Sequence, residues 1–152
     1  MEDFVTFEIA KKLKEKGFTC KYPFAMYNEL GSYCPLTTSS DYVTSESGYK
    51  YRCYYDYNDF DENDFIAPTI SQVLKWLRKE RKLHIEPCIL ASADIDADGR
   101  VINEFTYWSF RIVSIVTGDM IYFEYEHVDD KRFDSYEQAT LAGIEYVLDN
   151  LI

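Results

Sequence analysis

The sequence predicts an α+β fold with the element order α-β-β-α-β-β-β-α. Two capping boxes, Thr69–Gln72 and Ser135–Gln138, each begin a segment with apolar residues at helical spacing. Apolar and polar residues alternate over residues 104–114, which is typical of a half-buried strand. This order favours an antiparallel sheet with helices packed on one face. The length of 152 residues fits a single domain over residues 1–152.

The first predicted element is a helix over residues 6–17. Thr6 can cap its start, and Gly17 can end it in a left-handed conformation. Its apolar residues share one face at helical spacing; they are Ile9, Ala10 and Leu13.

The next part of the chain predicts strands with irregular connections. Residues 25–30 and 49–57 are the strand candidates because they are rich in aromatic residues. Small polar residues between them predict a loop over residues 36–48, and four acids in seven residues predict a second loop over residues 58–64.

The second helix begins at the capping box Thr69–Gln72, directly after Pro68. We expect Trp76 to lie in the core. The end of this helix, Lys75 to Lys82, carries five basic residues and one acid, in a chain that is otherwise acidic. The negative end of the helix dipole accounts for part of this pattern, and an acidic loop of the same or another copy is a second option.

Three strands are predicted to follow, over residues 84–94, 104–114 and 119–128. Thr117-Gly118-Asp119 predicts a hairpin turn between the last two. A final helix starts at the capping box Ser135–Gln138. Its expected apolar face consists of Ala139, Ala142, Ile144, Val147, Leu148 and Leu151.

Composition limits the expected partners and location. The chain has 16 basic and 27 acidic residues, a net charge of -11, which repels phosphate backbones and argues against nucleic acid as a partner. No segment approaches the roughly 20 apolar residues of a membrane helix. The acidic start Met1-Glu2-Asp3 is unlike a signal peptide, so we expect a cytoplasmic protein with reduced cysteines.

Several short stretches serve as landmarks along the chain: the opening Phe4 to Phe18, Ala67-Pro68-Thr69, Gln72-Val73, Trp76-Leu77-Arg78, His84-Ile85, and Phe133, Tyr136, Glu137 and Ala139. In these landmarks the sequence resembles a family of small uncharacterised proteins encoded by gut bacteria and their phages. These landmarks cover most of the chain apart from residues 20–65. The resemblance implies an accessory protein of a mobile element, and it implies no catalytic residue.

The most specific motif for chemistry is the segment from Asp94 to Val101. Its D-x-D-x-D-G pattern matches the first half of a calcium loop, where carboxylates and a turn-forming glycine surround the cation. The expected ligands are the carboxylates of Asp94, Asp96 and Asp98 and the backbone carbonyl of Arg100. The loop lacks its closing glutamate, because Phe105 stands there and Glu104 comes one residue early. The alternative interpretation is an acidic hairpin turn without a cation.

No other residue pattern predicts catalysis. His84 and His127 are the only histidines, and no nucleophile has a base that sequence can identify. Asp129-Asp130 and the acids of residues 56–64 are more typical of solvated loops than of a carboxylate pair.

We therefore expect a non-catalytic accessory protein that acts through protein–protein interaction. The expected partner is another protein or a second copy of the chain, with Tyr-rich strands and acidic loops at the contact surface. One alternative is an acidic mimic of DNA that inhibits a nucleic-acid enzyme, based on the charge of -11. Another is a calcium-binding protein or a metal-dependent enzyme.

Overall fold

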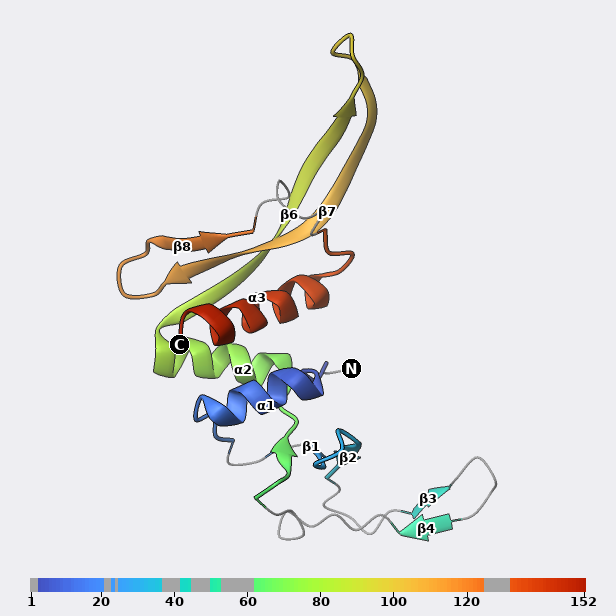
Figure 1. The fold of residues 1–152 in the computed structure, drawn as a ribbon, viewed down its shortest axis with the longest axis vertical. Coiled ribbons are helices and arrows are strands. Elements are labelled where there is room, and N and C mark those ends of the chain that lie inside the picture. The colour runs from blue at the N-terminus through green and yellow to red at the C-terminus, as the bar shows by residue number, and fades with distance from the viewer. Residues whose placement is uncertain are drawn as a thin grey trace. The chain divides into compact units, whose positions relative to one another are not determined.

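The chain forms two compact units, residues 1–72 and residues 73–152, and the boundary falls within helix α2 (Ile70–Trp76). The computed structural model describes residues 3–20, 23, 25–36, 62–124 and 132–152, and the backbone of residues 42–44 and 50–52 (Figure 1). The described chain contains both helices and antiparallel sheets, so the predicted α+β class is confirmed. One domain over residues 1–152 stays a prediction.

Helix α1 (Phe7–Glu15) of the first unit begins and ends where the sequence predicts. The Thr6 hydroxyl oxygen accepts a hydrogen bond from the Ile9 amide at 3.3 Å. Gly17 has a φ of +78°, the left-handed conformation that only glycine adopts without strain. The predicted apolar face is buried; its residues are Ile9, Ala10 and Leu13.

A small antiparallel sheet accompanies α1 in the first unit, in the order β2-β1-β5. Its strands are β1 (Ala25–Tyr27), β2 (Tyr33–Pro35) and β5 (Phe65–Ile66). The Phe7 ring meets Tyr27 and Phe65 edge to face, with centroids 5.5 and 5.4 Å apart. The buried Tyr27 hydroxyl donates to the Val5 carbonyl at 2.7 Å, and burial raises the pKa of Tyr27.

The prediction for residues 36–48 needs correction. The predicted loop over residues 36–48 contains a strand, β3 (Tyr42–Thr44), which pairs antiparallel with β4 (Lys50–Arg52). Strand β4 lies within the predicted strand 49–57, whose other residues are outside the described chain. Strands β2 and β5 are absent from the prediction because two or three residues are too short to show alternation.

The capping box of α2 forms as predicted. The Thr69 amide donates to the Gln72 side-chain oxygen at 2.9 Å, and the Gln72 amide donates to the Thr69 hydroxyl at 3.3 Å. The helix then widens into a π-helical turn, η2 (Leu77–Arg81), which ends at Lys82 with a φ of 58°. Trp76 is half-buried rather than core, and the Arg81 guanidinium lies 5.1 Å from its ring centroid.

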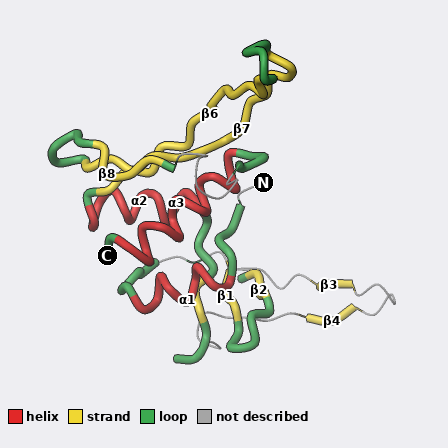
Figure 2. Tube along the Cα trace, turned by 45° about the horizontal axis from the view of Figure 1, so that its top comes forward, coloured by secondary structure: helices red, strands yellow, loops and turns green. Residues whose placement is uncertain are grey.

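The second unit contains an antiparallel sheet in the order β6-β7-β8, which confirms the three predicted strands (Figure 2). They are β6 (Leu83–Ile95), β7 (Val101–Ser114) and β8 (Met120–Phe123). Residues 125–128 of the last predicted strand are outside the described chain. The long β6–β7 hairpin runs in register from Leu83↔Ser114 to Asp94↔Asn103.

Helix α3 (Tyr136–Asn150) packs against β6 and β7. Its start differs in one detail from a reciprocal capping box: Ser135 accepts from the Gln138 amide, while the Gln138 side chain accepts from the amide of Asp134. Gly143 brings the helix close to the sheet, since a Cβ there would lie 2.7 Å from Cγ2 of Ile85. The described helices include none that is long and apolar enough to cross a bilayer.

Candidate functional site: the arm of the β6–β7 hairpin

The β6–β7 hairpin has two halves with different surroundings. Near its base, α3 covers one face, and Ile85, Phe110 and Ile112 are buried. Residues 89–107, here called the arm, extend beyond α3 as a two-stranded ribbon (Figure 1). Strand β8 pairs only with Arg111 to Val113 of β7, below the arm. The arm is therefore the part of the hairpin with the least covering among the described residues.

Apolar residues on the arm are exposed to solvent. Ile89 is 59% exposed, Ile95 62% and Ile102 67%, and Val101 is also exposed. An isolated two-stranded ribbon is marginally stable in water, because it lacks a second layer on which to bury its apolar side chains. The arm thus presents apolar surface that a partner could cover.

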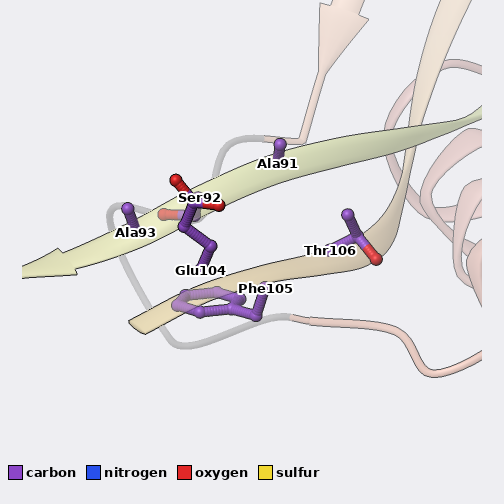
Figure 3. A pocket seen from close by; sticks show the side chains of 6 residues that line it. All are labelled: Ala91, Ser92, Ala93, Glu104, Phe105 and Thr106. Carbon is purple, nitrogen blue, oxygen red and sulfur yellow. The ribbon is translucent and has the colours of Figure 1, made fainter. Parts of the chain in front are cut away.

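The two faces of the arm differ in character. Residues that pair across the hairpin share a face, so Ile89 and Ala91 lie on the face that α3 covers further down. A pocket of 590 Å³ lies along this part of the ribbon and is lined by residues of both strands, Ala91, Ser92, Ala93, Glu104, Phe105 and Thr106 (Figure 3). Its lining is formed by small side chains, one aromatic ring and one carboxylate.

The opposite face of the arm is aromatic. Phe105 and Tyr107 lie side by side on β7, and the Arg132 guanidinium lies 4.3 Å from the Phe105 ring centroid and 5.9 Å from that of Tyr107. These three residues contribute to a second pocket of 510 Å³. Neither pocket lining includes a histidine or a cysteine. Sequence reasoning missed Arg132, because its contact with β7 is made in space and has no local signal.

The residues of the predicted calcium loop form the turn at the tip of the arm, and hydrogen bonds within the turn connect several of them. One Asp96 carboxylate oxygen accepts from the amides of Asp98 and Arg100 at 2.9 and 2.8 Å. The Asp96 amide donates to the Arg100 carbonyl at 2.9 Å, and Gly99 adopts a φ of +79°. The expected ligands at Asp96 and Arg100 are thus already hydrogen-bonded within a hairpin turn.

The three carboxylates of this turn do not gather around one point. In residues 62–124, as in the rest of the described chain, no three Asp, Glu, His or Cys side chains lie together as a metal ion requires. Calcium binding by Asp94, Asp96, Asp98 and Arg100 stays a prediction, and a calcium-dependent rise in melting temperature is the result that would support it.

The other candidate residues lie apart from the arm or outside the described chain. His84 is at the base of β6, and its buried Nδ1 has no hydrogen-bond partner among the described residues. His127, Asp129 and Asp130 are outside the described residues. Cys20, Cys34 and Cys88 are thiols rather than disulfides.

Comparison with known proteins gives no relative from which a function could be transferred. No protein-family model, no curated protein and no solved structure matches the chain. The resemblance to proteins of gut bacteria and their phages therefore stays a prediction. The feature of the molecule that points to a function is the exposed surface of the arm.

Proposed function

We propose that the protein is a non-catalytic interaction protein that binds another protein through the arm. The observation that carries this proposal is the exposed apolar surface of a ribbon that no described helix or third strand covers. Large exposed apolar patches are typical of surfaces that contact another protein.

The chemistry of the arm favours a protein over nucleic acid. Asp94, Asp96 and Asp98 lie at or near its tip, and the whole chain carries a charge of -11, so phosphate groups would be repelled. A protein partner could add a strand to the ribbon and bury alternate side chains against it. The aromatic face formed by Phe105 and Tyr107 offers the residue types that contribute strongly to such interfaces.

The test is affinity capture from a host lysate with three versions of the full chain, each at low and at moderate salt. The arm variant is Ile102→Asp, which places a charge at a residue that is 67% exposed. The control variant is Leu30→Asp, which makes the same kind of change at an exposed residue of the first unit. All three proteins should have the same circular dichroism spectrum.

We expect a protein that the wild-type chain and Leu30→Asp retain at moderate salt, and that Ile102→Asp loses. Equal retention by all three versions would place the contact surface elsewhere and contradict the proposal. Retention of a nucleic-acid enzyme at low salt only, by all three, would support the acidic DNA mimic instead.

A further inference from the structure

The outer edge of β6 is open in the described part of the chain. Strand β6 pairs on one side only, with β7, and no other described strand adjoins it. Such an edge presents backbone amides and carbonyls to a further strand. Which residues point outward follows from the hydrogen bonds of β7.

Trp108 of β7 exchanges two backbone hydrogen bonds with Phe133, at 2.9 and 3.2 Å, on the side away from β6. Its cross-strand partner Ile89 therefore also points its N–H and C=O away from β7, toward the open edge. The backbone N–H and C=O groups alternate in direction along a strand. Those of Ala91 and Ala93 therefore point toward the open edge as well. Pro87 also faces outward by this alternation. A proline is tolerated there because the pairing of β6 with β7 uses no N–H group of residue 87.

The two ends of β6 carry opposite charge. Immediately before the strand come four basic residues and one acid, all exposed; they are Arg78, Lys79, Glu80, Arg81 and Lys82. At its other end the strand end and the turn carry three acids and one base, Asp94, Asp96, Asp98 and Arg100, so the two ends still differ in the sign of their net charge. A strand with a basic start and an acidic end is self-complementary in an antiparallel pair, because each end then meets the opposite charge of the other copy.

We infer that two copies of the chain pair along the outer edges of their β6 strands, antiparallel and about a two-fold axis near Ile89. This inference goes beyond the proposed function, because it adds pairing with a second copy along β6 to the binding of another protein through the arm. With Ile89 opposite itself, Asp94 lies opposite His84 of the other copy, and Asp96 is level with its Lys82. A register shifted by two residues toward the tip would instead place Glu86 opposite Asp94, with like charges facing each other.

This pairing also covers one of the exposed apolar residues of the arm, Ile89. Ile89, which is 59% exposed, would lie against its own copy at the centre of a six-stranded sheet. Pro87 and Ala91 would be opposite each other on the same face. The net charge of -11 opposes association at long range, but at an ionic strength of about 0.15 M such repulsion is screened beyond about 8 Å.

The first measurement is sedimentation velocity of the full chain at about 0.15 M salt, from about 1 μM to about 1 mM protein. We expect a reversible equilibrium between monomer and dimer. A chain that is monomeric throughout this range overturns the inference but leaves the proposed function to its own capture test.

Two proline variants test the backbone pairing directly. Ile89→Pro removes an outward N–H at the centre without removing a bond to β7, and should raise the dimer dissociation constant by about tenfold or more. Pro87→Ala adds an outward N–H and should lower that constant, although it removes apolar surface. Both proteins should keep the wild-type circular dichroism spectrum. A dimer that Ile89→Pro leaves unchanged uses a different interface, and this result also overturns the inference.

A charge exchange tests the antiparallel orientation. Lys79→Glu and Asp98→Lys should each weaken the dimer by about three- to tenfold, since each reduces the attraction between the basic end of one copy and the acidic end of the other, at both ends of the dimer. The double variant should recover most of the loss. Losses that simply add in the double variant would contradict the antiparallel arrangement.

Hydrogen exchange provides an independent signature. Amides of Ile89, Ala91 and Ala93 should become protected as protein concentration rises, whereas those of Leu90 and Ser92 already face β7 and should change little. Uniform protection of all five, or no change with concentration, would contradict pairing at this edge.

Discussion

The base and the arm of the β6–β7 hairpin are made by the same two strands but differ in what covers them. At the base, Ile112 of β7 is 0% exposed because α3 packs on its face of the sheet. Ten residues earlier on β7, in the arm, Ile102 is 67% exposed. The comparison shows that a strand sequence with regular apolar residues does not by itself specify a core. A covering layer is needed, and the arm has none among the described residues.

The largest expected effect is a loss of stability caused by a substitution in the base that leaves the arm unchanged. Ile112→Ala should lower the free energy of unfolding by about 2–5 kcal/mol, because it leaves a cavity in a fully buried site. Ile102→Ala makes the same chemical change on the same strand, and should alter that free energy by no more than about 0.5 kcal/mol. Urea denaturation at low protein concentration, where the chain is monomeric, measures both. Similar losses for the two variants would mean that the arm is covered in solution.

The sequence predicted the elements of this hairpin better than the difference between its halves. The capping boxes at Thr69 and Ser135 were predictable because each depends on residues three positions apart. Ile102 and Ile112 could not be distinguished, since burial depends on where α3 packs, and that is a tertiary contact. The start of β7 was predicted at residue 104 instead of Val101, because the residues after the acidic motif show no local signal of pairing with β6.

The position of β6 at the edge of the described sheet was only partly predictable from the sequence. Pro87 lies inside β6, and a proline usually indicates an edge strand. That signal could have placed β6 at the edge of the sheet. It could not have shown which backbone groups point outward, because that requires the register with β7 and the bridge between Trp108 and Phe133.

The close approach of α3 to the base is the next feature to test. Gly143→Ala in an exposed helix would add about 1 kcal/mol of stability from helix propensity. Here the new Cβ would lie 2.7 Å from Cγ2 of Ile85 and 3.1 Å from Cδ2 of Phe110, so something must move. We expect a net loss of about 1–3 kcal/mol in the free energy of unfolding.

A double-mutant cycle with Ile85→Ala isolates this contact. If the Ile85 side chain causes the loss, Gly143→Ala should cost less in the Ile85→Ala background than in the wild type. Equal costs in both backgrounds would show that the overlap with Ile85 does not determine the effect.

A smaller effect is expected at the start of α3. Ser135→Ala removes the hydroxyl that accepts from the Gln138 amide at 3.2 Å, and should cost about 1 kcal/mol in the free energy of unfolding. Ser135→Asp keeps an acceptor at this position and adds a charge that the helix dipole favours, so it should retain most of the stability. A loss as large with Asp as with Ala would mean that the missing hydrogen-bond acceptor is not the cause of the loss.

The smallest expected effect concerns the ion pair between Glu86 and Arg111, on the face of the base opposite to the one that α3 covers. Glu86 and Arg111 are cross-strand partners, and the Arg111 Nε donates to a Glu86 carboxylate oxygen at 2.5 Å. This hydrogen bond, more than the charge of Arg111 itself, lowers the pKa of Glu86 below its ordinary value of 4.5. The folded state therefore favours the ionised carboxylate. Its contribution is fully present above pH 4.5 and is lost as the pH falls through the lowered pKa of the folded state.

Both side chains of this pair are more than two-fifths exposed, so water screens their interaction and the change in stability should be slight. Glu86→Gln should thus melt slightly below the wild type at neutral pH, and the difference should disappear as the pH falls well below 4.5. In an NMR titration, Arg111→Gln should return the pKa of Glu86 toward its ordinary value. If that pKa stays low in Arg111→Gln, a group other than Arg111 stabilises the carboxylate. The stability of the base would then depend less on this cross-strand pair than on the packing of α3 against its other face.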